Sequence, residues 1–288
     1  MNKFIKIVLE LIKYKVSIAV TFTAITGYLV FTGTFDIHVI YLALSIFILA
    51  GGSSALNECQ ENKYDALMDR TKNRPIPTGK ISILQAWIVS SIFTISGLVL
   101  LYFIFDEITA LLGLINLVWY NIIYTNLKRV SSFAVVPGSM VGAIPVLMGW
   151  TAAGGYVFHP TIVFIAFFIF IWQVPHFWLL MLKYGKQYEE AGFKTINQAL
   201  HPQNLRLVIY AWVIATSFSS IIVPLFLTNL SLPFFLIIFA LNLSFIAIFT
   251  KLSFGKTEEL NFRKSFISIN LYMMVFMLSL IIYHLVSI

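Results

Sequence analysis

Apolar residues occur along this chain in long stretches that are separated by short polar segments. Each stretch continues for about 18–23 residues, which is the length of a helix that crosses a bilayer. A helix satisfies its own backbone hydrogen bonds, so it is the favoured structure in lipid. The predicted membrane helices cover residues 16–34, 38–57, 84–105, 108–127, 134–153, 160–182, 207–227, 233–251 and 266–286. We therefore expect an all-α, polytopic membrane protein in which nine helices surround a central cavity and residues 1–288 form a single domain.

Positive charge is confined to alternate connecting segments. All 19 Lys and Arg precede the first stretch or lie at the end of an even-numbered stretch and in the segment after it. The other connections, residues 34–38, 105–107, 154–160 and 227–233, contain none. Cationic segments are retained on the cytoplasmic side of a membrane. The pattern predicts a protein of the cytoplasmic (inner) membrane, with the N-terminus in the cytoplasm and the C-terminus outside.

Composition excludes several other classes of protein. A mean hydropathy of +0.90, with 59% hydrophobic and 11% charged residues, excludes an ordinary soluble protein. The net charge of +7 follows mainly from the topology, so it does not indicate nucleic-acid binding. It favours membrane lipid with anionic headgroups, and anionic ligands, at the inner face. The lone Cys59 excludes an intrachain disulfide, and residues 1–15 lead into the first span without an evident cleavable signal peptide.

The segment after the second stretch carries the main candidate chemistry. Polar residues recur there at every fourth position, as Asn57, Glu61, Asp65 and Asp69. On an α-helix this spacing places neighbours about 6 Å apart on one slowly rotating face, and like charges so placed call for a compensating cation. Carboxylate oxygens completed by substrate phosphates suit Mg²⁺. The spacing therefore predicts a magnesium site.

Three cations follow this row directly. Arg70, Lys72 and Arg74 are suited to bind phosphate oxygens, and Arg can do so bidentately. We expect Pro75 and Pro77 to end the helix. The alternative interpretation is a solvated loop of mixed charge that serves only the topology.

The polar spacing and the residues that follow it resemble a known family. Asn57-x3-Glu61-x3-Asp65 with MDRTKNRPIPTG is similar to the first aspartate-rich motif of the UbiA-type intramembrane prenyltransferases, with Glu61 in place of the usual Asp. The RTxxRP continuation resembles the heme O synthase branch. YTNLKR at 124–129, PVLMGW at 145–150 and WQVPHFW at 172–178 resemble further elements of that branch, with Val146 and Val174 each replacing a Pro. Nine is also the span count of the family.

The resemblance implies a chemistry and a set of site residues. Heme O synthases transfer a farnesyl group from farnesyl diphosphate to the vinyl group of protoheme IX, with hydration, and heme A synthase is the partner that the resemblance implies downstream. The implied Mg²⁺ ligands are Asn57, Glu61 and Asp65. The implied diphosphate-binding residues are Arg70, Arg74 and Lys128. Catalytic roles fall to Asp65, Lys128 and Tyr124, which faces the same cavity, while Asp69 lies further out or exposed.

Several of these residues have simpler alternatives. Lys128 also serves the membrane orientation, and Tyr124 at this depth also suits an interfacial anchor. His176 lies in the inner half of the sixth stretch, where a His usually faces the bundle interior. We expect it either to contact the porphyrin or its iron, or to be a packing residue beside Phe177 and Trp178.

The second acidic motif of the family is altered. After the sixth stretch the chain reads KQYEEAG at 186–192, so Gln187 stands where the resemblance leads us to expect Asp. Three explanations compete: one metal assisted by Lys186 or Lys194, replacement by Glu190 three residues on, or a changed activity or substrate. The last includes an acceptor such as a quinone precursor, a chlorin or a glycerol phosphate. A non-enzymatic membrane protein, such as a transporter or a heme-binding assembly factor, is the remaining class.

Overall fold

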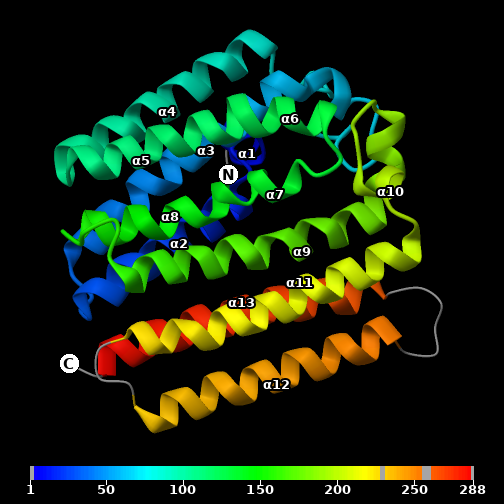
Figure 1. Cartoon of the computed structure of the whole chain (residues 1–288). Coiled ribbons are helices and arrows are strands. Elements are labelled where there is room, and N and C mark those ends of the chain that lie inside the picture. Colours follow the sequence, from blue (N-terminus) through cyan, green and yellow to red (C-terminus); the bar gives the residue numbers. More distant parts are fainter. Residues whose placement is uncertain (1–2, 228–230, 255–260, 287–288) are drawn as a thin grey trace.

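Long helices cross the molecule side by side in alternating directions (Figure 1). The structure, a computed structural model, describes residues 3–227, 231–254 and 261–286, and within them it contains helices and no strands. The first half contains α1 (Lys3–Leu11), α2 (Tyr14–Thr32), α3 (Ile37–Asp65), α4 (Ile83–Ile104), α5 (Glu107–Val118), the π-helix η1 (Trp119–Tyr124) and α6 (Thr125–Val130). The second half contains α7 (Val135–Gly138), α8 (Met140–Ala152), α9 (Pro160–Glu190), α10 (Ile196–Ala199), α11 (Pro202–Ile222), the 3-10 helix η2 (Val223–Phe226), α12 (Leu232–Phe254) and α13 (Phe262–Val286).

The predicted spans are confirmed for the part of the chain that the structure describes. Nine helical segments there are long and apolar enough to cross a membrane. α3 and α9 extend beyond the predicted ends at 57 and 182, because their last turns are polar and project past the apolar stretch. Both extensions carry candidate site residues.

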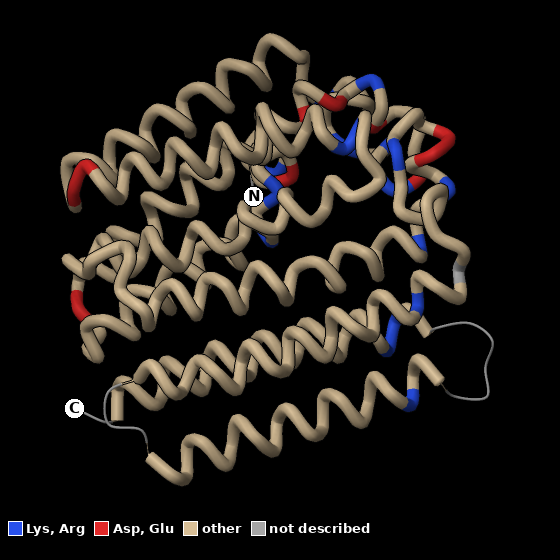
Figure 2. The backbone as a smooth tube through the Cα atoms, in the orientation of Figure 1, with Lys and Arg blue, Asp and Glu red and all other residues tan. Residues whose placement is uncertain are grey.

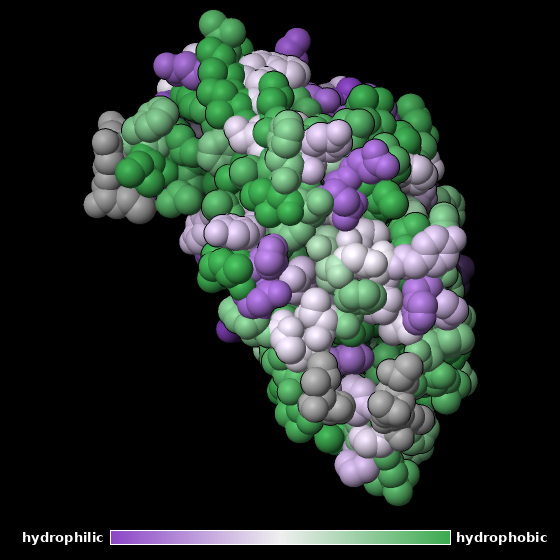
Figure 3. Space-filling view, turned by 90° about the vertical axis from the view of Figure 1, so that its left-hand side faces the viewer, coloured by the Kyte–Doolittle hydropathy of each residue, from purple (hydrophilic) through white to green (hydrophobic). Residues whose placement is uncertain are grey.

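The outer surface of the bundle is apolar along its flanks. On α4, Leu84, Ile95 and Phe103 are 68%, 62% and 77% exposed. Side chains of this kind suit contact with lipid rather than water. Hydrophobic residues also occupy much of the surface at the end that Figure 3 shows, between scattered polar groups.

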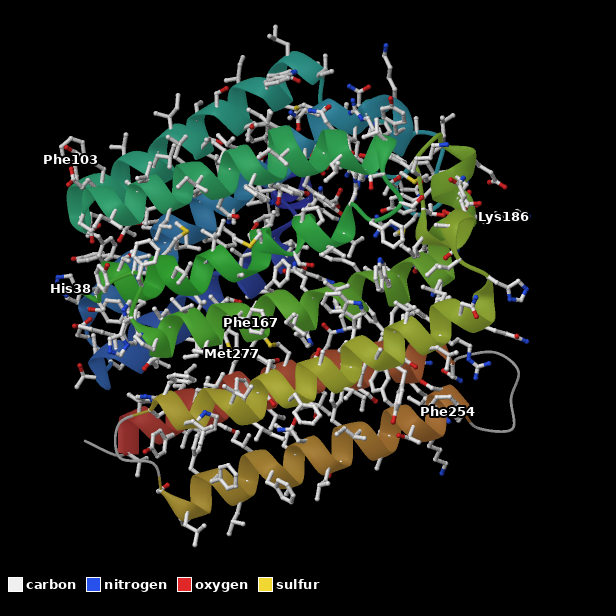
Figure 4. All side chains as sticks on the ribbon, viewed as in Figure 1. His38, Phe103, Phe167, Lys186, Phe254 and Met277 are labelled. Atoms are coloured by element: carbon white, nitrogen blue, oxygen red, sulfur yellow. The ribbon has the colours of Figure 1, made fainter. Side chains whose placement is uncertain are left out.

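Among the described residues, one end of the bundle has no Lys or Arg, while Asp and Glu occur at both ends (Figure 2). Many of the described Lys and Arg lie toward the end that holds the 66–82 loop and the last turn of α9, and a second group lies beside the N-terminus. Asp36 and Asp106 cap the starts of α3 and α5, in turns whose described residues include no Lys or Arg. Figure 4 marks the two ends, with Lys186 at one and His38 and Phe103 at the other. Lys256 of the predicted pattern lies outside the described residues.

Close backbone contact joins α2 to α8. A side chain on Gly27 would collide with the carbonyl oxygen of Val146, and one on Gly149 would collide with that of Ala24. Small residues let membrane helices approach in this way and pack tightly. The crossing fixes α2, and with it the chain segment that precedes it, against the centre of the bundle.

The prediction that α3 continues to Pro75 was wrong. The helix ends at Asp65, whose carbonyl oxygen accepts a hydrogen bond from the hydroxyl of Thr71 at 2.9 Å. This bond satisfies a terminal carbonyl and turns the chain into the 66–82 loop ten residues before the proline. Asp69 therefore lies outside the helix and is exposed, paired with Lys72.

Candidate active site at the basic end of the bundle

Three oxygen-bearing side chains form a row along the last two turns of α3. Asn57, Glu61 and Asp65 are only 2%, 5% and 1% exposed. Their four-residue spacing on a continuous helix places them along one face, so that each oxygen lies one turn from the next. We call these three residues the oxygen row. Its burial excludes the alternative of a solvated, mixed-charge loop for this stretch.

Each member of the oxygen row is paired with a cation from a different part of the chain. Lys13 Nζ donates to Asn57 Oδ1 at 2.9 Å. Lys128 Nζ lies 2.6 Å from Glu61 Oε1, and Arg74 Nη1 donates to Asp65 Oδ2 at 2.6 Å.

These cations come from the corner before α2, from α6 and from the 66–82 loop. Burying carboxylates is costly unless they are paired, and Lys128 and Arg74 supply that pairing for Glu61 and Asp65, while Lys13 bonds the neutral amide of Asn57.

Lys13 is the one cation of the row that the sequence interpretation missed. It lies between α1 and α2 with φ 47°, the only non-glycine residue with positive φ among the described residues. Burial lowers the pKa of Lys13 to about 7, and the positive charge of Arg74 acts in the same direction, against the nearby carboxylates. The only sequence signal is that Lys13 lies three residues before the first predicted stretch, where the charge pattern alone assigns it to the topology.

Arg74 is held in the site by two carboxylates. Burial opposes its charged form, but Asp65 first and then Glu58 outweigh burial and raise the pKa of Arg74. Glu58 also accepts a hydrogen bond from the backbone N–H of Ile76 at 3.4 Å. These contacts tie the 66–82 loop against the end of α3.

A π-helix orients the side chains that face the oxygen row from α6. Inside η1, Asn121 accepts from the Ser53 hydroxyl at 2.6 Å and donates to the Ser53 carbonyl at 3.0 Å. One turn on, Thr125 Oγ1 accepts from Asn57 Nδ2 at 3.2 Å while donating to the Tyr120 carbonyl. A π-turn widens the helix locally and is common at functional sites. Here Asn121 and Thr125 join the continuous helix of α5, η1 and α6 to two successive turns of α3.

Tyr124, Lys128 and Arg70 line one cavity of about 110 Å³, together with Tyr188, Phe193 and Phe177. Lys128 Nζ lies 5.4 Å from the centre of the Tyr124 ring and 5.6 Å from that of Phe193, within cation–π distance. Three of the predicted site residues therefore border a common cavity that is lined in part by aromatic rings. Lys128 also contacts Glu61, so this cavity adjoins the oxygen row.

The altered second motif packs against the 66–82 loop. Gln187 Oε1 accepts from the backbone N–H of Arg70 at 3.2 Å, and the Arg70 guanidinium donates to the Tyr188 hydroxyl. Glu189 accepts a hydrogen bond from the Thr195 hydroxyl. Glu190 is exposed at the last residue of α9, so its role as a metal ligand stays a prediction.

His176 lies deeper in α9, among aromatic rings. Its ring centre is 4.9 Å from those of Trp172 and Phe266 and 5.4 Å from that of Phe177. Its Nδ1 and the neighbouring Gln173 Oε1 are buried and have no hydrogen-bond partner within the described part of the chain. Two such atoms one helical turn apart are suited to receive a polar ligand.

The chemistry of the oxygen row fits Mg²⁺ held jointly with a ligand. Within the described ranges, no group of three or more His, Cys, Asp or Glu side chains is gathered in a way that could hold a metal alone. The oxygen row offers two carboxylates and one amide oxygen. Proteins usually bind Mg²⁺ through one or two carboxylates, and phosphate oxygens of the substrate complete the site. Asn57, Glu61 and Asp65 would be the residues that hold it.

Known proteins are similar to this chain over most of its length. The UbiA prenyltransferase family matches residues 19–279. The protoheme IX farnesyltransferase of Christiangramia forsetii is 37% identical over 223 residues, which are 75% of this chain and 72% of that protein. The enzyme of the same name from Flavobacterium johnsoniae is 38% identical over 219 residues, 72% and 71% of the two chains.

Solved structures share the fold. A digeranylgeranylglyceryl phosphate synthase is similar with a TM-score of 0.79 at 20% identity, over 99% of each chain. A UbiA homolog from Archaeoglobus fulgidus bound to GPP and Mg²⁺ gives 0.75 at 17% identity, over 98% of this chain and 100% of that one. The all-α fold and the resemblance predicted from the sequence are confirmed. The chain is an integral, multi-pass membrane protein and belongs to the UbiA prenyltransferase family.

Proposed function

We propose that this chain transfers the farnesyl group of farnesyl diphosphate to a vinyl group of protoheme IX and so forms heme O. The names of its relatives support the pair of substrates. The observation that carries the proposal within the structure is the buried oxygen row, which meets three cations. One of them, Lys128, also lines the adjoining, partly aromatic cavity. A site of this kind suits an anionic headgroup with an apolar tail.

The reaction breaks one allylic C–O bond and forms one C–C bond. The diphosphate leaves with the electron pair of the C–O bond, and the vinyl π electrons bond to the farnesyl cation. Water then captures the resulting cation beside the porphyrin ring and releases a proton. Bound Mg²⁺ would supply positive charge against the diphosphate as it leaves.

The chain's own residues bind and orient the diphosphate. Arg74 and Lys128 already lie beside the oxygen row, and Arg70 lines the adjoining cavity. Charge-assisted hydrogen bonds from these groups to phosphate oxygens are stronger than neutral ones. Tyr124 presents its ring to the same cavity, where it excludes water from the allylic cation before the acceptor attacks.

We assign acceptor binding to the region of His176. The aromatic rings of Trp172, Phe177 and Phe266 offer flat apolar surfaces for a porphyrin, and His176 Nδ1 is a candidate ligand of the heme iron. In the membrane, we place the oxygen row on the cytoplasmic side of the inner membrane, as the charge pattern predicts. Heme A synthase is then the partner that would use the product.

Product analysis tests the proposal. Purified protein is incubated with Mg²⁺, heme and prenyl diphosphates of several lengths, with EDTA in a parallel reaction. We expect a product with the mass of heme O from farnesyl diphosphate, and none with EDTA. No heme product, together with a prenylated aromatic or glycerol phosphate acceptor in parallel reactions, would move the assignment to another branch of the family.

A further inference from the structure

Lys13 controls the orientation of Asn57. The amide nitrogen of Asn57 donates to Thr125 Oγ1, which leaves its oxygen to accept from Lys13 Nζ. That oxygen is the only atom through which Asn57 can bind a magnesium ion. Lys13 thus occupies the ligand atom from one side while Thr125 fixes the amide from the other.

The same pattern repeats along the whole oxygen row. Lys128 contacts the carboxylate of Glu61, and Arg74 contacts that of Asp65. A divalent cation that arrives alone meets three positive groups already on its ligands. It must displace them at an electrostatic cost, since like charges at close range repel.

Two of these three cations, Lys13 and Arg74, also line a groove in which they could contact an anion. It has a volume of about 340 Å³, opens to the outside, and lies between the α1–α2 corner and the 66–82 loop. Lys13, Lys15, Arg70 and Arg74 line it, and Glu10 is its only acidic lining residue. An anion in this groove would attract Lys13 and Arg74 away from the oxygen row.

We propose that Lys13 couples the binding of the metal to the binding of the diphosphate. In the free protein it holds the Asn57 oxygen, and when a diphosphate enters the groove it transfers to the anion and releases that oxygen for Mg²⁺. The inference rests on the proposed use of Mg²⁺ and a prenyl diphosphate. Coupling of this kind is reciprocal, so each ligand strengthens the binding of the other by the same factor.

Metal binding measured without turnover tests the coupling. The full chain in nanodiscs is titrated with Mn²⁺ as a spectroscopic substitute for Mg²⁺, with and without inorganic pyrophosphate. We expect pyrophosphate to increase the metal affinity of the wild-type protein at least about tenfold, within the usual range of coupling between sites. An affinity independent of pyrophosphate overturns the proposal, whatever the variants do.

Two variants and one control then identify Lys13. Lys13→Met keeps the chain length and removes the charge, so metal binding without pyrophosphate should strengthen and the coupling should fall severalfold. Lys13→Arg keeps the donor and should retain the coupling. Lys6→Met removes an exposed cation of α1 that does not line the groove, and it should match the wild type. Full coupling in a folded Lys13→Met protein would refute the role of Lys13.

The source of the anion is separated in the same assay. Phosphate replaces pyrophosphate in one arm, and nanodiscs of anionic lipid replace neutral ones in another. Enhancement by anionic lipid alone would assign the groove to headgroups and overturn the coupling to diphosphate. The assay contains no heme or farnesyl group, so failure of the proposed reaction with intact coupling remains distinguishable.

Discussion

Replacing Asp65 by Asn tests the oxygen row most directly, because Asp69 provides a matched control four residues later. The Asp65 side chain is 1% exposed and bonded to Arg74 at 2.6 Å. Asp69 is 73% exposed and pairs with Lys72, which is itself 53% exposed. Asn preserves the shape of either residue and one oxygen, and it removes the charge by replacing the other oxygen with an amide nitrogen.

The two substitutions should differ greatly in their effects on turnover and on stability. Removing one preorganised group that stabilises developing charge costs about 2.7–4 kcal/mol, or about 10²–10³ in turnover. Asp65→Asn also removes the first of the two carboxylates that stabilise the charge of Arg74, and leaves Glu58. Breaking a buried pair destabilises by about 3–5 kcal/mol, and the 23% exposure of the Arg74 side chain places the effect at the lower end. An exposed pair such as Asp69–Lys72 contributes only about 0–1 kcal/mol.

The assay measures the rate of heme O formation by mass spectrometry. It is run at a temperature below the thermal unfolding transition of each variant, so that every variant is folded. Asp65→Asn should lose at least about 100-fold in rate, while Asp69→Asn should stay within about twofold of the wild type. Equal rates for the two folded variants would refute the assignment of the buried row as the metal site.

Four further results follow from the structure. Lys128→Met should lower turnover by about 10²-fold and Lys128→Arg by less, measured as the rate of pyrophosphate release; equal losses would contradict a charge role. His176→Ala should weaken heme binding about tenfold in a spectroscopic titration, and unchanged binding would remove its contact with the porphyrin. A Cys at Gly154 should react with an impermeant thiol reagent from outside intact cells and one at Lys72 should not; the reverse would invert the topology. With pyrophosphate present, Mn²⁺ titration should reach one ion per chain, and two would point to a second site that includes Glu190.

The sequence was sufficient for the spans because their signal is local. A continuous apolar stretch predicts a membrane helix without reference to any other part of the chain, and each predicted stretch has its helix within the described residues. The ends were less certain, since polar turns carry α3 on to Asp65 and α9 on to Glu190. The end of α3 depends on a hydrogen bond from Thr71, which no helix propensity would reveal.

Only part of the site could be predicted, because its members meet through the fold. The periodic spacing identified Asn57, Glu61 and Asp65 as one face of a helix. Which cation pairs with which oxygen depends on segments distant in sequence, such as Lys13, 44 residues before Asn57. Lys13 has a left-handed backbone conformation, which a sequence usually signals by a glycine, and Lys13 is not a glycine.

The contacts of the altered second motif explain why Gln is suitable at position 187. Gln187, in the position where the family resemblance predicts Asp, accepts from the backbone N–H of Arg70, and Glu189 is bonded to Thr195. Both oxygens therefore hold the end of α9 against the 66–82 loop and its neighbouring turn, and Glu190 is exposed at the helix end. Gln187 is half-buried, so a charged carboxylate there would bring a further, partly desolvated negative group next to a loop that already contains the Asp65–Arg74 pair. A neutral amide keeps the hydrogen bond at a lower cost, which favours the explanation that the site uses one Mg²⁺, assisted by Lys186 or Lys194, over replacement by Glu190.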